Sequence, residues 1–181
     1  MGNVRLYGAT SGYTELAPPA VAPDGVLSLP SGTGTLLTAE GGKVLQVVRA
    51  TDTTNRSTTS TSFVDVTGMS VTITPQKSTS AIIILVSAVG SSSGGSTSSL
   101  TNFQITDSSN NTISGAQGML LGAVNNTMNN QVCVSLIGYA TPAALSAVTY
   151  KVRFRSESTG STSSMRNAEN TGQLYAIEVS A

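Results

Sequence analysis

Histidine and tryptophan are absent from this chain of 181 residues, and cysteine occurs once. Without histidine, the chain lacks the commonest general base, the Ser-His-Asp triad and every histidine-containing zinc site. One cysteine forms neither a disulfide within the chain nor a cysteine-based metal centre. These absences predict a protein that is not an enzyme and that needs no cofactor and no metal.

Charge and long apolar runs are also scarce. Charged residues make up 10% of the chain, and the formal net charge is zero, which provides no long-range attraction toward nucleic acid or anionic lipid. The longest apolar run, 81–86, is six residues, far below membrane-spanning length. The first residues lack the apolar stretch of a signal peptide. We therefore expect no nucleic-acid or membrane partner, and synthesis in a cytoplasm without secretion.

Serine and threonine are abundant, at about 29% of the residues. With valine and glycine and little charge, this composition is typical of β-strands joined by tight turns. From Lys43 onward the apolar residues recur with the period of two of a strand, and no window shows a helical period. Strand faces are predicted at Val44–Ala50, Met69/Val71/Ile73, Leu100–Thr106, Val132/Val134/Leu136, Tyr150/Val152/Phe154 and Tyr175/Ile177/Val179. The sequence thus predicts an all-β, antiparallel jelly-roll or β-sandwich over residues 43–181.

Two apolar segments carry further expectations. Ala81–Ala88 is apolar at almost every position, which predicts a central strand buried on both faces. Cys133 lies in the run Gln131–Leu136 and is expected to be a buried, inert thiol, since cysteine behaves as a small hydrophobe. Glycine-rich stretches at 32–34 and 90–95 are predicted to be turns, because neither lies between a strand and a helix.

Residues 1–42 differ from the rest and form a predicted extended N-terminal arm. They contain four of the six prolines and consist of short apolar groups, each closed by Gly, Pro or Ser. Such pieces are too short for strands with a core of their own, so we expect them to pair with other chains or to wrap a surface. A solvated linker is the alternative. The predicted anchors are Leu6, Tyr7, Leu16, Val26, Leu27, Leu29, Leu36 and Leu37.

Several polar residues are expected to be structural. Asp65 and Glu178 lie within predicted strands, where a solvent-facing position is favoured. Pairing of these acids with Arg153 or Arg155 across a subunit contact is the alternative. The stripe Lys151-Arg153-Arg155 is interpreted as a solvated or ion-paired face rather than as a site for an acidic partner. The cluster at 107–112 predicts a turn, with calcium binding as a weaker alternative because carboxylate and amide oxygens suit that ion. Segments 91–99 and 125–130 are predicted to be exposed loops.

The stretch Val4–Ala22, continued by Val26–Leu37, resembles a segment of bacteriophage structural proteins, especially those of marine phages, that are described as tail fibre, head fibre or decoration proteins. In strand pattern, the remainder resembles the jelly-roll knobs that end many phage fibres, similar in outline to the tumour-necrosis-factor type. The resemblance implies a homotrimer in the virion. A chain poor in large apolar residues favours association independently, because binding between copies stabilises the folded state.

These observations favour a trimeric capsid decoration (cement) protein that binds and stabilises the phage head, with the major capsid protein or another virion protein as partner. Three arms that bind together would make weak contacts strong. The alternative is a tail fibre or knob whose loops at 91–99, 107–112 and 125–130 bind a host surface glycan, although these loops contain no aromatic residue. A glycan hydrolase that uses two carboxylates is a third, weaker hypothesis.

Overall fold

The structure is a computed structural model that describes residues 4–7, 12–16, 43–94, 99–121 and 130–180. The chain divides into two units, residues 1–37 and 38–181. In the first unit, β1 (Val4–Tyr7) pairs antiparallel with β2 (Tyr13–Leu16). These two pieces of the predicted arm therefore pair with each other, as a two-stranded hairpin, within one chain.

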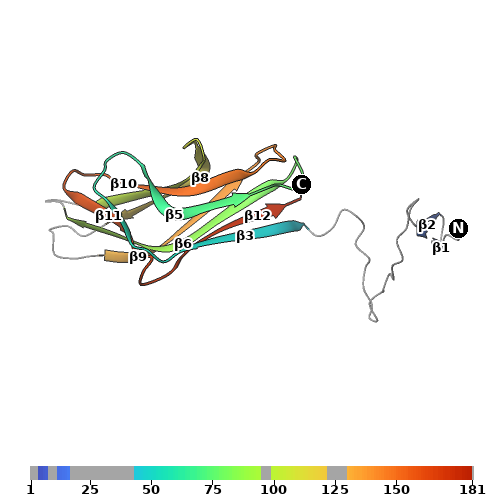
Figure 1. Cartoon of the computed structure of the whole chain (residues 1–181), viewed down its shortest axis with the longest axis horizontal. Coiled ribbons are helices and arrows are strands. Elements are labelled where there is room, and N and C mark those ends of the chain that lie inside the picture. Colours follow the sequence, from blue (N-terminus) through green and yellow to red (C-terminus); the bar gives the residue numbers. More distant parts are fainter. Residues whose placement is uncertain (1–3, 8–11, 17–42, 95–98, 122–129, 181) are drawn as a thin grey trace. The chain divides into compact units, whose positions relative to one another are not determined.

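The second unit is a sandwich of two antiparallel sheets (Figure 1). The six-stranded sheet contains β3 (Val44–Asp52), β12 (Gly172–Val179), β6 (Ala81–Gly94) and β9 (Asn130–Ala140), with the short β11 (Ser161–Met165) and β4 (Arg56–Thr58) beside the far end of β6. The four-stranded sheet contains β5 (Val64–Ile73), β10 (Val148–Ser156), β7 (Leu100–Asp107) and β8 (Thr112–Leu121).

The eight long strands are connected as a jelly roll. Their spatial order is β3-β12-β6-β9 in one sheet and β5-β10-β7-β8 in the other, so the first long strand pairs with the last and the chain crosses repeatedly between sheets. The predicted all-β sandwich is confirmed, and no helix occurs among the described residues. In the same part of the chain, no helix long and apolar enough to cross a membrane is found.

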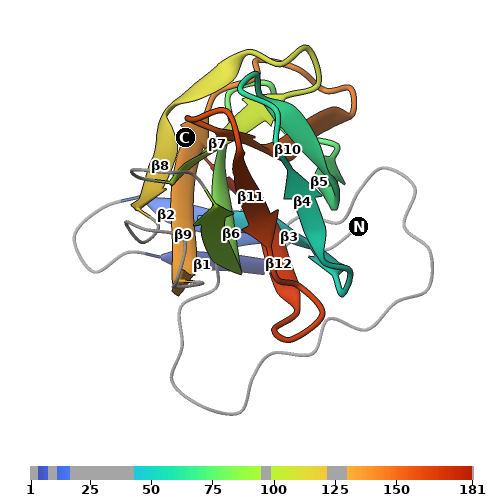
Figure 2. The ribbon, with the colours of Figure 1, turned by 90° about the vertical axis from the view of Figure 1, so that its left-hand side faces the viewer.

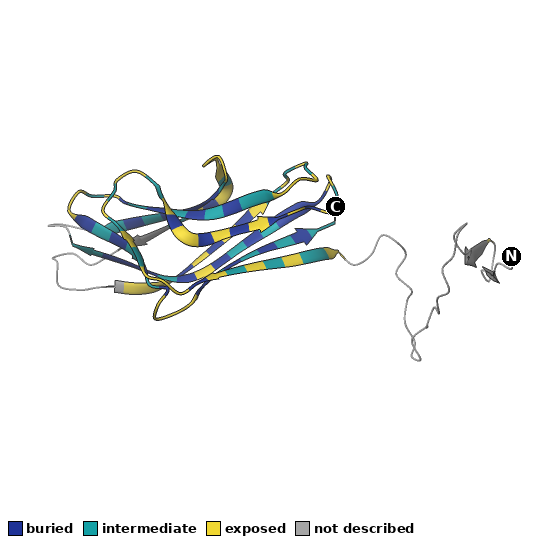
Figure 3. Ribbon diagram, in the orientation of Figure 1, coloured by how far each residue is buried: buried dark blue, intermediate teal, exposed yellow. Residues whose placement is uncertain are grey.

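The core lies between the sheets and is built by alternation. Buried and exposed residues follow each other along the strands (Figure 3), as the period of two requires. The predicted inward faces of β5 and β10 are confirmed, since every member is at most 3% exposed: Met69, Val71, Ile73, Tyr150, Val152 and Phe154. Phe103 and Phe154, on the neighbouring strands β7 and β10, stack within the core with ring centroids 6.3 Å apart. Two of the three phenylalanines of the chain are thus core residues.

One end of the sandwich is packed with serine and threonine instead of large apolar residues. Ser91–Gly94, predicted to be loop and turn, belong to β6 and pair with β11. Residues 90–94 read Gly-x-Ser-x-Gly, a pattern that in hydrolases marks an exposed nucleophilic serine, but here Ser92 is fully buried within the strand. The Thr101 hydroxyl donates to Ser163 Oγ at 2.7 Å. The loop prediction was wrong here because a second serine-rich strand supplies the backbone partners that turn residues otherwise lack.

Strand β12 reverses the expected assignment of its two faces. Leu174, Ala176 and Glu178 point inward and are fully buried, whereas Tyr175 and Ile177 lie on the outer face and are only partly covered. The prediction that Glu178 faces solvent is therefore wrong. Pairing with β3 on one side and β6 on the other determines which face points inward, and a shift of one residue would exchange the two.

Candidate interaction surfaces

Three of the eight predicted anchors lie on described strands. Leu6 and Tyr7 are on β1 and Leu16 is on β2, where Tyr7 pairs with Tyr13 and Val4 with Leu16. Leu6 pairs with Thr14, so the three anchors lie on neighbouring strands, but Leu16 is at the opposite end of the hairpin from Tyr7. The other predicted anchors lie outside the described residues: Val26, Leu27, Leu29, Leu36 and Leu37. The attachment arm stays a prediction.

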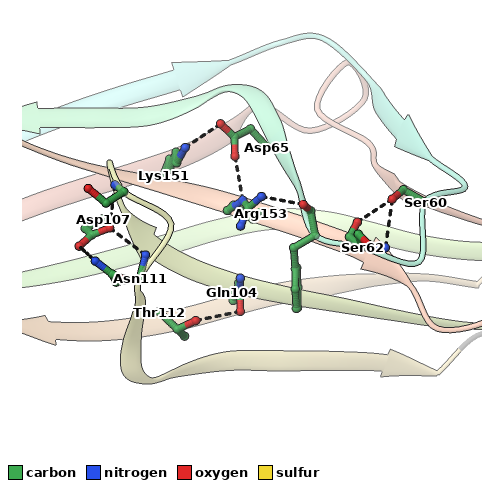
Figure 4. Close-up of polar contacts among 11 residues, drawn as sticks. Ser60, Ser62, Asp65, Gln104, Asp107, Asn111, Thr112, Lys151 and Arg153 are labelled. Atoms are coloured by element: carbon green, nitrogen blue, oxygen red, sulfur yellow. Dashed lines mark hydrogen bonds and ion pairs between the residues drawn. The ribbon is translucent and has the colours of Figure 1, made fainter.

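The predicted turn at 107–112 connects β7 and β8 (Figure 4). The Asp107 carboxylate accepts hydrogen bonds from the backbone N–H groups of Ser109 and Asn111, at 2.8 and 2.9 Å, and from the side-chain amide of Asn111. Asn110 takes the left-handed conformation with φ of 70°. The carboxylate oxygens are therefore occupied by donors of the turn itself, which is a structural use rather than an ion site. Of the other two predicted loops, residues 95–98 and 125–129 lie outside the described residues, and Asn130 begins β9.

Ion pairs cover the outer face of the four-stranded sheet (Figure 4). Asp65 on β5 accepts from Lys151 Nζ and from Arg153 Nε on β10, both at 2.8 Å. Arg155 pairs with Glu157 at 2.7 Å and lies over the ring of Phe63, 5.0 Å from its centroid. The predicted ion-paired face is confirmed. The partners of Lys151, Arg153 and Arg155 belong to the same chain, so no second subunit is needed to neutralise them.

We expect replacement of Asp65 by asparagine to reduce stability only slightly. Burial raises the pKa of Asp65, but the hydrogen bonds and charges of Lys151 and Arg153 outweigh it and hold the pKa below its ordinary value of 3.8. The ionised Asp65 therefore stabilises the fold fully above pH 3.8, and this stabilisation is lost as pH falls through the lower pKa of the folded state. Because Asp65 is 47% exposed, the loss at pH 7 should be only about 0.5–1 kcal/mol. Urea unfolding of the wild type and the variant measures this loss of unfolding free energy. A loss at about pH 2 equal to that at pH 7 would contradict the ion pairing of Asp65.

Four described carboxyl groups have a lowered pKa, each for local reasons: Asp52, Asp65, Asp107 and Glu178. Asp52, for example, accepts from Asn167 at 2.9 Å and pairs with Arg56 at 3.4 Å. A general acid in glycoside hydrolysis needs a raised pKa instead. Among the described residues, no group of three acidic or cysteine side chains is placed to hold a metal ion. These four carboxylates serve the fold.

The outer face of the six-stranded sheet is apolar over one half. Strands β3, β12, β6 and β9 lie side by side (Figure 2), and their register places residues in rows across the sheet. The first row is Val47, Ile177, Ile83 and Tyr139; the second is Arg49, Tyr175, Leu85 and Ile137. The third row is polar: Thr51, Gln173, Ser87 and Ser135. We call the first two rows, with Val44 and Val179 beside them, the apolar outer face.

Several large side chains on this face are uncovered. Val47 is 56% exposed, Ile137 67% and Tyr139 61%. Cys133 is exposed on the same side of β9, paired with Val89, so the prediction of a buried thiol was wrong. The reason is alternation: Val134 and Leu136 occupy the inner face of β9, which leaves the outer face to Cys133. The sequence shows the period of two in β9, but it does not show that only one face of this strand is buried.

No family model matches the sequence, and no curated protein sequence matches it. Among solved structures, the chain is similar to "Structure of infectious bursal disease virus Gx strain", with a TM-score of 0.39 and 16% identity over 97% of this chain and 45% of that chain. A second is "Crystal structure of infectious bursal disease virus VP2 subviral particle", with a TM-score of 0.31 and 15% identity over 96% of this chain and 45% of that one. The chain spans less than half of these proteins. At these scores the likeness does not identify a family.

Proposed function

We propose that this chain is a non-enzymatic structural protein of a bacteriophage particle, a homotrimeric decoration protein that binds and stabilises the head. What carries the proposal is the combination of a jelly-roll body with a separate N-terminal unit whose sequence, Val4–Ala22 and Val26–Leu37, resembles phage virion proteins.

In this proposal the action of the protein is adhesion. The arm, residues 1–42, contacts the major capsid protein or another virion protein, and the body, residues 43–181, faces outward. Each arm offers only short apolar groups, so a single arm binds weakly. Three arms on one trimer bind with a high effective concentration, and the avidity exceeds the single affinity by about 10²–10⁴-fold.

Removal of residues 1–42 is expected to abolish binding to capsids while the body keeps its strand content and oligomeric state. The matched full-length variant replaces Leu27 and Leu29 with aspartate, which removes apolar contacts without shortening the chain. Co-sedimentation with capsids that lack the protein measures binding, and circular dichroism checks the fold. A truncated protein that still decorates capsids would show that the arm is not the attachment segment.

The second candidate is a receptor-binding knob of a tail fibre. The well-ordered, exposed turn around Asp107, held by its own side chain, favours it, since such loops at the end of a sandwich commonly carry binding sites. Labelling a C-terminal tag in intact particles separates the two. Many copies spread over the head support decoration, whereas a few copies confined to the tail support the knob.

A further inference from the structure

The apolar outer face is more than scattered apolar residues on a surface. Four of the six large apolar side chains that are exposed in the described part of the chain lie on it: Val44, Val47, Ile137 and Tyr139. They flank the partly covered Ile83, Leu85, Tyr175 and Ile177 on the two central strands. The cluster is therefore continuous from one edge of the sheet to the other.

The strands beneath this face have the composition of strands that are covered on both sides. In β6, Ile82 and Ile84 point into the core while Ile83 and Leu85 point outward. Near-continuous apolar runs of this kind belong to sheets with both faces buried. Within the described residues, nothing covers the outer side. Strand β12 makes the contrast sharper, because it turns Ile177 outward and satisfies Glu178 inside with a set of hydrogen bonds.

Charge distinguishes this face from the opposite one. The four-stranded sheet presents Lys151, Arg153 and Arg155 with their carboxylate partners, which suits contact with water. In its rows, the apolar outer face carries a single charged side chain, Arg49. That guanidinium lies over the ring of Tyr175 at 5.7 Å and donates to Gln173 at 3.2 Å, so it lies along the sheet. An apolar surface of a neighbouring copy would meet little electrostatic repulsion there.

The area of the face suits one of several contacts in a closed oligomer. The two apolar rows extend over about four residues of about 3.3 Å each on four strands about 4.8 Å apart, and Val44 and Val179 extend two of these strands by about two residues, which makes a face of roughly 300 Å² in projection. Covering it with an equal area of a neighbouring copy removes about 600 Å² from water. This is a small contact by itself, but a closed trimer contains three of them.

We propose that copies of this chain bind one another through the apolar outer face, and that a second copy is its occupant. This inference rests on the association of copies in the proposed function and assigns a surface to it. The polar row at Ser87 and Ser135 marks one boundary of the contact, and Cys133 lies beyond that row, near the margin.

The test uses two full-length variants in which an exposed apolar side chain becomes lysine. Ile137→Lys places a charge on the face at a position 67% exposed, where the fold itself tolerates it; Leu145→Lys, 61% exposed and outside the strands, is the matched control. We expect light scattering to show a multimer for the wild type and for Leu145→Lys, and a monomer with unchanged circular dichroism for Ile137→Lys. An Ile137→Lys multimer of wild-type mass would overturn the assignment.

Wild-type binding to phosphatidylcholine vesicles that Ile137→Lys loses would also overturn the inference, because the occupant of the face would then be a lipid surface. A monomeric wild type that still decorates capsids would refute this interface and leave the attachment role intact.

Discussion

Replacement of Glu178 by alanine is expected to lower the free energy of unfolding by about 3 kcal/mol. The buried carboxylate accepts from Gln46 Nε2 at 2.6 Å and from the backbone N–H groups of Gln76 and Lys77 at 2.8 and 3.2 Å. These contacts tie β3 and the segment after β5 to the end of β12. Alanine leaves the backbone N–H groups of Gln76 and Lys77 without this acceptor, whereas Gln46 Nε2 keeps its hydrogen bond to the Thr74 carbonyl at 2.6 Å. A donor left without a partner costs more than the hydrogen bond itself contributes. Chemical unfolding in urea at pH 7 measures the change.

The acid response of Glu178 provides an independent check. Burial raises its pKa, but the hydrogen bonds from Gln46, Gln76 and Lys77 outweigh this effect and hold the pKa below its ordinary value of 4.5. The ionised Glu178 therefore contributes to the free energy of unfolding above pH 4.5, and this contribution is lost as pH falls through the folded pKa. The difference in unfolding free energy between wild type and variant should become smaller in that range. Glu169→Ala is the control, since Glu169 is 44% exposed and pairs with Arg166 at the surface. A loss for Glu169→Ala as large as that for Glu178→Ala would contradict this account.

Replacement of Phe154 by alanine is expected to cost about 3–5 kcal/mol. Its ring is 2% exposed and stacks within the core on that of Phe103, which is 1% exposed. Because the chain has only three phenylalanines and no tryptophan, few large neighbours are available to fill the cavity. Urea unfolding measures the loss, with the slope of the transition as a check that the native state stays compact.

Phe63→Ala is the matched control for the core. Phe63 is only partly buried and contacts the guanidinium of Arg155 on the outer face of the four-stranded sheet. An exposed cation–π contact contributes about 0.5–1 kcal/mol, so the loss should be several times smaller than for Phe154. Equal losses of unfolding free energy for Phe63→Ala and Phe154→Ala would show that the Phe103–Phe154 stack contributes no more than a surface contact.

Much of the fold was predictable because alternation is a local property. Met69, Val71 and Ile73 indicate one buried face in the sequence, because polar residues separate them and only one side of the strand is apolar. The same holds for β10, where Lys151, Arg153 and Arg155 mark the opposite side. In such strands the identity of the buried face follows from the sequence, and the ion-paired stripe follows with it.

The prediction failed where both sides of a strand were apolar or where neither was. In β12, Tyr175 and Ile177 compete with Leu174 and Ala176 for the interior, and the pairing register with β3 and β6 decides between them. Ser91–Gly94 have no apolar side at all, yet they form a strand because β11 supplies partners from about seventy residues away. Contacts between distant segments cannot be read from a local pattern.

By itself, the sequence determined the all-β class, the jelly-roll or sandwich architecture, the positions of most long strands and the inward faces of those with one apolar side. The tertiary structure alone decided that Glu178 is buried, that Cys133 is exposed and that one half of the outer face of β3, β12, β6 and β9 is apolar. The physical reason is that a period of two divides a strand into two faces, whereas the neighbours of that strand decide which face is covered.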